Sequence, residues 1–385
     1  MKIISSLFCF FLIFSGINAC NLEHQEIFSL KKNGEILNRK DITRFFKFSN
    51  PTFNNQFIVT DPLVLQDAAR SALLYFKSKK KSNEKLLNPK IFSSKIANFD
   101  YVKKTLEFII WSIEKDKQKK SSFRILDTKF LEKNFKFIRW FGDVNNAQKN
   151  KVKIPENLDN GKIPNGKIRL TNYAVFVLNG RSKRSKNFPC ALYAIRNKEF
   201  ESKDRFKYTK QDIFNRALHN RKNKNRVKPL VWLKKDDLET AMMQGTTYVR
   251  MPDNKKRLFC VDKNNGFAYD KKISNPSEQK RYWYFKEISK KQFFEKNGFH
   301  LKHKEVIFAG DVHNIGLGKL IAIKYQNPVS KKNEMRIGIL ADTGGAFKNN
   351  LYQLDFFGGV DSKYKFKKRL QSIPNTVEAY ILVKK

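Results

Sequence analysis

Cysteine is scarce in this chain, since only four of its 385 residues are cysteines. No cluster of histidine, cysteine and aspartate has the spacing of a metal site, so the sequence does not predict one. The sequence also lacks internal repeats, a long low-complexity tail and, beyond its N-terminus, any segment apolar enough to cross a bilayer. With 41% hydrophobic residues, the chain can fill real cores and is long enough for two domains.

Acidic residues are also few, and the balance of 78 Lys and Arg against 36 Asp and Glu gives a net charge of +42. One interpretation is attraction to a polyanion, such as nucleic acid, anionic lipid or the carboxylates of a cell-wall peptide. The other is codon bias in an AT-rich genome, because Lys, Asn, Phe and Ile are all abundant. We favour codon bias, since the lysines are spread along the whole chain. No recognised RNA or DNA motif is present, so no nucleic-acid partner is expected.

Residues 1–20 have the organisation of an export signal. A short positive start precedes an apolar run at residues 3–14, which is too short to span a bilayer. Ile17-Asn18-Ala19-Cys20 then has the pattern of a lipobox, whereas a plain signal-peptidase site would prefer a small residue in place of Ile17. A diacylated Cys20 is therefore favoured over simple secretion. Asn21 favours the outer membrane, so the sequence predicts a protein lipid-anchored at Cys20 on the periplasmic side of that membrane.

Two cysteines follow the signal and the lipidated Cys20, namely Cys190 and Cys260. In an oxidising compartment they can form a disulfide or remain two separate thiols. Their spacing does not decide between these alternatives.

Hydrophobic periodicity predicts helices first and strands later. Helices are expected at 65–76, 99–113 and 130–141, after a first strand at 56–60. A loop rich in Pro, Asn and Gly at 152–167 is typical of a linker or hairpin. The middle of the chain is expected to have strands at 173–178, 246–251, 258–261 and 282–285, and helices at 209–218, with Thr209 as N-cap, and 236–243.

The last part of the chain is predicted to be all strand and turn. Its β-rich runs are often apolar on both faces, as in a small closed barrel. They lie at 304–309, 320–325, 335–341, 354–357 and 377–383.

Three aspartates in this last part stand beside glycines: Asp311, Asp342 and Asp355. Asp342 and Asp355 are thirteen residues apart, each at the edge of an apolar run with a glycine pair nearby. Taken singly, each aspartate is more simply explained as a turn or cap residue. Together they form the only close carboxylate group with glycine context, which favours chemistry such as glycosidic cleavage, where a carboxylic acid protonates the bridging oxygen.

This arrangement resembles the three-aspartate domain of the membrane-bound lytic murein transglycosylase A (MltA) family. Further segments resemble that family in the same order, so the similarity covers nearly all of the mature chain. Residues 170–180 are similar to its F-T-G-Y-Y-x-P-x-L-x-G segment, and residues 243–247 to its V-Q-G-S-G. The other similar segments are residues 188–194, 264–269 and 310–319.

The resemblance implies a fold that is mainly β with α, that is, α+β. A double-psi β-barrel would carry N-terminal helices and an inserted second β domain. The implied boundaries are 1–20 for the lipoprotein signal, 21–170 for the N-terminal part of the barrel domain, 171–303 for the inserted domain and 304–385 for the C-terminal three-aspartate part. A groove between the domains would hold a glycan strand.

The resemblance also implies a lytic transglycosylase that cuts the β-1,4 bond between N-acetylmuramic acid and N-acetylglucosamine without water or a cofactor. Asp355 would be the single acid and base, and Asp342 would tune it. Such an acid needs a raised pKa, which burial beside Phe356 and Phe357 or the charge of Asp342 would supply. The expected partners are peptidoglycan and other cell-wall enzymes. The expected glycan-binding residues are Thr171, Tyr173, Gln244, Gly245, Thr246, Asp311, Gly344, Gly345 and Lys348.

Several positions depart from the family pattern. Asn172 and Thr247 stand where the family has glycine, and Asn349 ends a turn that is I-K-G in the family. Asparagine can adopt left-handed conformations. Two extra residues separate Asp342 from Asp355, so a non-catalytic peptidoglycan-binding lipoprotein with the same fold is the alternative.

Overall fold

The computed structural model describes residues 44–79, 98–150 and 161–385, apart from positions 221, 224, 271 and 274. The predicted signal at 1–20, including Cys20, lies outside the described residues, and the predicted linker at 152–167 lies partly outside them. Within the described ranges, no helix is both long enough and apolar enough to span a membrane.

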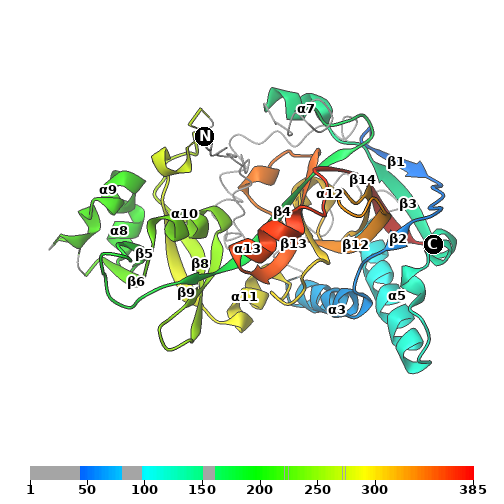
Figure 1. Ribbon diagram of the computed structural model, residues 1–385, viewed down its shortest axis with the longest axis horizontal. Helices are drawn as coiled ribbons and strands as arrows, with labels where there is room; N and C mark the ends of the chain where they lie inside the picture. The colour runs from blue at the N-terminus through cyan, green and yellow to red at the C-terminus, as the bar shows by residue number, and fades with distance from the viewer. Residues whose placement is uncertain are drawn as a thin grey trace, which may run out of the picture.

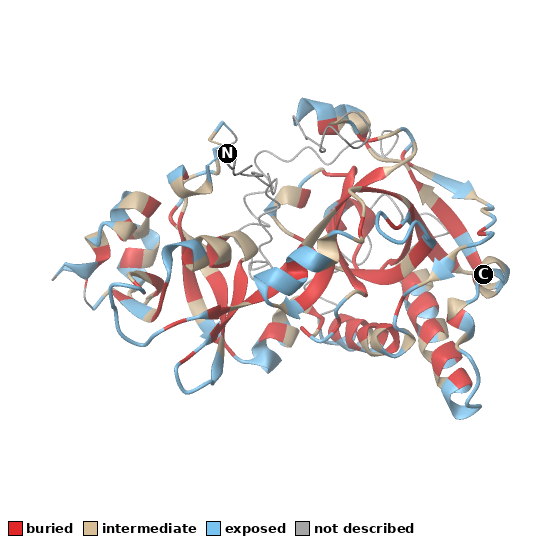
Figure 2. Ribbon diagram, in the orientation of Figure 1, coloured by how far each residue is buried: buried red, intermediate tan, exposed pale blue. Residues whose placement is uncertain are grey.

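Six strands close into a barrel in the order β4, β13, β10, β12, β11, β14 and back to β4. The β4–β13 and β10–β12 pairs are parallel, and the other four pairs are antiparallel. Most of their residues are buried, which confirms the closed barrel expected from runs that are apolar on both faces (Figure 2). The strands are β4 (Ile168–Asn179), β10 (Ile307–Ala309), β11 (Leu320–Gln326), β12 (Asn333–Asp342), β13 (Gln353–Asp361) and β14 (Thr376–Lys384).

Two long helices pack against this barrel, α3 (Pro62–Lys79) and α5 (Phe99–Gln118) (Figure 1). They confirm the helices expected at 65–76 and 99–113. Asn98 is the N-cap of α5, and its side chain accepts a hydrogen bond from the Tyr101 amide. The helix buries an apolar stripe against α3 and the barrel. Short strands β1 (Phe46–Ser49), β2 (Phe57–Ile58) and β3 (Phe135–Trp140) extend the sheet at its edges.

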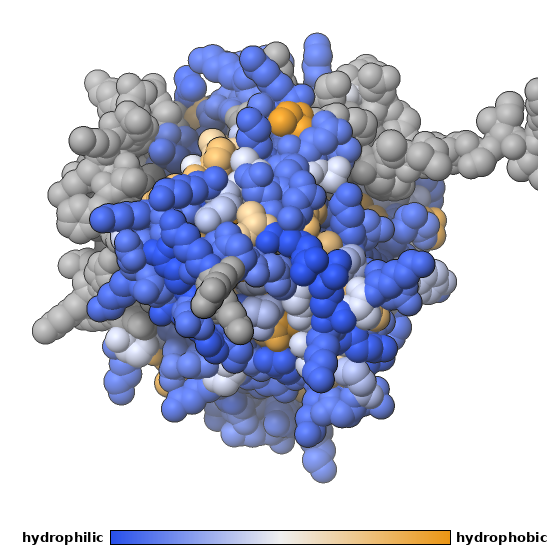
Figure 3. All heavy atoms as spheres, turned by 90° about the vertical axis from the view of Figure 1, so that its left-hand side faces the viewer, coloured by the Kyte–Doolittle hydropathy of each residue, from blue (hydrophilic) through white to orange (hydrophobic). Residues whose placement is uncertain are grey.

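Strand β4 is long enough to belong to two parts of the molecule. Its first residues pair with β13 and β14 in the barrel, and Phe176–Asn179 pair with β7 in the second part. That part lies on the left in Figure 1, and the face it presents in Figure 3 is mostly hydrophilic (Figure 1 and Figure 3). Its strands are β5 (Cys190–Ile195), β6 (Val227–Leu233), β7 (Thr246–Arg250), β8 (Lys256–Asn264) and β9 (Trp283–Ile288).

Shorter helices connect the strands of both parts. Thr209 caps α9 through a capping box with Asp212, which confirms it as an N-cap. These helices are α6 (Thr128–Asn134), α7 (Val144–Lys149), α8 (Lys198–Ser202), α9 (Lys210–Phe214), α10 (Lys235–Gln244), α11 (Lys290–Asn297), α12 (Val312–Ile315) and α13 (Lys363–Leu370).

The helix predicted at 130–141 is wrong in its second half. Helix α6 ends at Asn134, and the chain continues as β3, which pairs with β1 and β14. Phe135, Phe137 and Trp140 are buried in this strand, so their dense aromatic pattern reflects sheet packing rather than a helix face.

The expectation that the last part is all strand and turn is also wrong. Helices α12 and α13 interrupt the strands. Phe366 is the buried residue of α13, and most of the other positions carry lysine or arginine, so little apolar periodicity marks this helix. Cys190, on β5, and Cys260, on β8, are not joined to each other by a disulfide in this structure.

Candidate active site

A row of four side chains crosses neighbouring strands of the barrel. Asp355 on β13 is in register with Thr171 on β4 and with Ala309 on β10. Ala309 is in turn in register with Asp342 at the end of β12. Register partners project from the same face of a sheet, so the small side chain of Ala309 separates the two carboxylates on one face.

A β-bulge brings Asp342 into this row. Phe308 is in register with Leu340 but Ala309 is in register with Asp342, so Ala341 is the extra residue. An extra residue changes which side chain points to a given face, and bulges re-aim side chains in this way. The position of Asp342 therefore depends on an irregularity that alternation of apolar residues does not reveal.

Asp355 is completely buried, with an exposed fraction of 0%. Its Oδ1 accepts a hydrogen bond of 2.8 Å from Nε2 of Gln353, and the same nitrogen donates to Oγ1 of Thr171 at 2.9 Å. Oε1 of Gln353 accepts from the guanidinium of the buried Arg169 at 3.4 Å. Asp355 therefore belongs to a largely buried polar cluster of side chains from β4 and β13.

Asp342 is 6% exposed and is held by two donors. The Tyr173 hydroxyl donates to its Oδ2 at 2.8 Å, and the Thr343 amide donates to its Oδ1 at 2.8 Å. Burial raises the pKa of Asp342 to about 6, and the nearby charge of Asp355 acts in the same direction. Burial and the charge of Asp342 also raise the pKa of Tyr173 well above its usual range, so Tyr173 stays protonated and donates.

Asp311 is buried in a different setting. It caps α12 by accepting from the Asn314 amide, and its Oδ2 also accepts from the Asn314 side chain at 2.6 Å and from the Asn350 amide at 3.0 Å. Burial raises its pKa to about 6 against these hydrogen bonds. In this structure Asp311 ties α12 to the loop between Asp342 and Asp355.

The predicted binding residues of the second part lie beside β4. Oε1 of Gln244 accepts from the amide of Ala174 at 3.4 Å, next to Tyr173. Gly245 has a φ of 70° and ends α10, which explains the glycine there. Thr246 is buried, with its Oγ1 3.4 Å from Sγ of Cys260.

The loop after Asp342 carries the remaining predicted residues. Gly344 is half-buried in an extended conformation with φ −165°, while Gly345 and Lys348 are exposed. Asn349 has a φ of 51°, as expected for asparagine in place of glycine, whereas Asn172 is an ordinary strand residue paired with Phe356.

Three residues of this site were not expected from the sequence: Arg169, Ala309 and Gln353. Gln353 could have been found, because residues two apart in a strand share a face and Gln353 precedes Asp355 by two. Arg169 and Ala309 come from other strands, so only the pairing of β4 and β10 with β13 reveals them.

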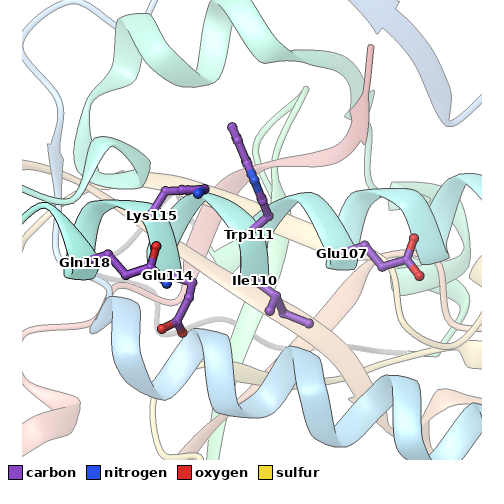
Figure 4. A pocket seen from close by; sticks show the side chains of 6 residues that line it. All are labelled: Glu107, Ile110, Trp111, Glu114, Lys115 and Gln118. Carbon is purple, nitrogen blue, oxygen red and sulfur yellow. The ribbon is translucent and has the colours of Figure 1, made fainter.

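A hollow of about 330 Å³ lies elsewhere, beside α5 (Figure 4). All the side chains that line it come from that one helix, and Trp111 among them is 50% exposed. No strand of the carboxylate row contributes to it, so we do not assign the reaction to this hollow. Among the described residues, no group of three or more His, Cys, Asp or Glu is placed to hold a metal ion.

No model of a known protein family and no curated protein matches this chain. Solved structures do match. The crystal structure of E. coli MltA with bound chitohexaose superposes with a TM-score of 0.56 at 13% identity, over 92% of this chain and 96% of that one. A membrane-bound lytic murein transglycosylase from Agrobacterium tumefaciens gives 0.51 at 15% identity, over 84% and 93%. MltA from Neisseria gonorrhoeae gives 0.51 at 14% identity, over 84% and 90%.

These likenesses extend over most of each chain. At identities of 13–15% they establish the fold. The chain is therefore an α+β protein with the double-psi β-barrel fold of the MltA lytic transglycosylases.

Proposed function

We propose that this protein is a murein lytic transglycosylase that cleaves the β-1,4 bond between N-acetylmuramic acid and N-acetylglucosamine. The observation that carries this proposal is the pair of buried carboxylates, Asp342 and Asp355, on either side of Ala309. A buried carboxyl can hold a proton at neutral pH, as an acid catalyst must. A protein of the same fold, E. coli MltA, has been solved with bound chitohexaose, which supports a glycan substrate.

In the proposed reaction, Asp355 acts as acid and then as base. Its O–H bond breaks and the proton passes to the bridging oxygen, while the C1–O bond breaks and its electron pair stays with that oxygen. The C6 hydroxyl oxygen of the same muramic acid then bonds to C1, and its proton returns to Asp355. The products are a 1,6-anhydromuramic acid end and a free 4-hydroxyl on N-acetylglucosamine, with no water consumed.

The other predicted roles are part of the proposal. Asp342 keeps the proton on Asp355 by placing a second negative charge nearby. The glycan would contact the residues on β4, on the turn after α10 and on the loop after Asp342. They are Thr171, Tyr173, Gln244, Gly245, Thr246, Gly344, Gly345 and Lys348, together with Asp311 before α12, which also fixes that loop.

We also propose the domain boundaries and the location given by the sequence. The mature chain would divide at 21–170, 171–303 and 304–385, after a signal at 1–20. Lipidation of Cys20 would hold the protein on the periplasmic side of the outer membrane, where its glycan substrate lies and other cell-wall enzymes are potential partners.

The test is mass spectrometry of the products released from peptidoglycan sacculi by purified protein that lacks residues 1–20. We expect anhydro-muropeptides from the wild type and none above background from Asp355→Asn, which keeps the shape but cannot donate the proton. Reducing-end products would instead indicate a hydrolase that uses water. Asp361→Asn, on the same strand but in an ion pair with Arg369, is the matched control and should keep activity.

One observation favours the second candidate, a non-catalytic peptidoglycan-binding protein. Asp355 is fully buried, so a sugar reaches it only if the side chains that cover it move. Binding of sacculi without release of any product, equal in the wild type and Asp355→Asn, would establish this alternative.

A further inference from the structure

Gln353 occupies a central place in the polar cluster around Asp355. Gln353 and Asp355 lie two residues apart on β13, and their register partners on β4 are Arg169 and Thr171. The four side chains therefore form a compact block on one face of two neighbouring strands. Gln353 touches all three of the others: it accepts from Arg169 and donates to Thr171 and Asp355.

Arg169 determines which way the amide of Gln353 points. An arginine side chain has only donors, so the atom that faces it must be the amide oxygen. The amide nitrogen is then directed at Asp355. Arg169 is buried, and although burial lowers its pKa, the charge of Asp355 opposes that shift, so the guanidinium keeps its charge and its donors.

The orientation of the Gln353 amide determines which oxygen of Asp355 carries the proton. The Gln353 nitrogen can only donate, and it donates to Oδ1 at 2.8 Å. The carbonyl oxygen of a protonated carboxyl is the better acceptor, so the proton is placed on Oδ2. We propose that Gln353, with its amide orientation fixed by Arg169, is a positioning residue that makes Oδ2 of Asp355 the oxygen that gives up and takes back the proton. This inference rests on the proposed transglycosylase function.

Other charged and titratable groups also act on Asp355 and set the direction of any pH effect. Arg169 on β4 and the amide of Gln353 favour the ionised carboxylate, whereas the carboxylate of Asp342 on β12 favours the protonated form. Tyr173 on β4 stays protonated and is hydrogen-bonded to Asp342. Removal of the Gln353 donor therefore favours the protonated form of Asp355 and moves its titration to higher pH.

The experiment compares wild type, Gln353→Leu and Gln353→Glu on isolated glycan strands across the pH range. Both variants lose the donor to Oδ1, and the carboxylate introduced by Gln353→Glu would keep the contact with Arg169. We expect kcat to fall about 10- to 100-fold with KM changed less than about threefold, because proton transfer is misaligned rather than binding lost. The basic limb of the kcat profile should move up by about one pH unit.

Gln66→Leu is the control for loss of a buried glutamine, because Gln66 bonds to Ile110 and Glu114 on α5, away from the carboxylates. It should reduce thermal stability without moving the pH profile. If Gln353→Glu folds and has the wild-type kcat and the wild-type basic limb, the positioning role is wrong. If kcat fell equally in Gln66→Leu and Gln353→Leu and the basic limb did not move, the role of Gln353 would be structural only.

A second measurement separates this inference from the proposed function. The carboxyl carbon of Asp355, assigned by its absence in Asp355→Asn, is titrated by ¹³C NMR without substrate. A higher midpoint in Gln353→Leu than in the wild type supports the hydrogen bond to the carboxylate even if no product is ever released. An unchanged midpoint overturns the inference, while a wild type that releases no anhydro-muropeptides overturns the reaction on which it rests.

Discussion

At the scale of single residues, Asp311 and Asp342 show how the same burial can have different consequences. Burial raises the pKa of each to about 6. The oxygens of Asp311 face amide donors from Asn314 and Asn350, which cannot accept a hydrogen bond. Asp342 faces one such donor and the hydroxyl of Tyr173, which can donate or accept.

The pH dependence of stability follows from the raised pKa of Asp342. Between about pH 4 and about pH 6 the unfolded chain has released this proton while the folded protein still holds it. The contribution of Asp342 to the free energy of unfolding therefore falls as the pH rises through this window, and it is constant above the window. Asp342→Asn cannot ionise. As the pH rises through this window, the free energy of unfolding of Asp342→Asn should therefore increase relative to that of the wild type by about 2 to 3 kcal/mol. Urea unfolding at several pH values measures this difference.

Asp311→Asn is the matched comparison for that measurement. Its amide NH₂ would face a donor, so this variant should be less stable than Asp342→Asn at pH 7 by about 1 to 3 kcal/mol. Equal stabilities of the two asparagine variants at pH 7 would contradict the different hydrogen-bonding roles assigned to the two carboxylates.

At the scale of secondary-structure elements, the site depends on the spacing across β12, β10 and β13. Ala309 lies between the two carboxylates, and the bulge at Ala341 brings Asp342 level with it. A larger side chain at residue 309 would compete with both carboxylates for space. The shortest strand of the barrel therefore separates the two buried carboxylates.

Ala309→Val should reduce activity about 100-fold, since a displacement of about 1 Å at a reacting group has that effect. Ala322→Val is the control, because Ala322 is equally buried on β11, in register with Ile337 and Tyr380 rather than with either carboxylate. Both variants should lose about 1 to 3 kcal/mol of stability from overpacking, measured by thermal unfolding. Similar losses of activity in the two would mean that Ala309 matters only for packing.

The sequence predicts the elements whose pattern is strong and local. Helices α3 and α5, the cap at Thr209 and the apolar strands of the barrel were predicted because periodicity and capping act over a few residues. The helix predicted at 130–141 was wrong in its second half, because an aromatic-rich run suits a helix or a strand and the pairing of β3 with β14 decides between them. The same limit applies to the site: Asp342 and Asp355 stand out, but Arg169 and Ala309 depend on long-range pairing.

At the scale of the whole molecule, β4 joins the barrel to the second part without a break. The boundary predicted between residues 170 and 171 falls inside this strand. Residues at its start pair with β13 and β14 and those at its end pair with β7, so neither part can lose β4 and keep its own sheet.

We therefore expect the two parts to unfold together. Differential scanning calorimetry should show one transition whose calorimetric and van't Hoff enthalpies agree. Two fluorescence probes should report the same midpoint: Trp232 in the second part, and Trp140 on β3, which pairs with the barrel strand β14. In each variant the other tryptophans are replaced by phenylalanine. Two separate midpoints would show that β4 does not couple them.

The shared strand also has a mechanical consequence. A force that draws the two parts away from each other along β4 would load this strand directly. The hydrogen bonds of the parallel β4–β13 and β4–β7 pairs would then carry the load in shear rather than opening one after another. Thr171 and Tyr173 lie on the part of β4 that bears this load. The distances from their side chains to Asp355 would therefore stay constant under a force that would separate domains joined less directly.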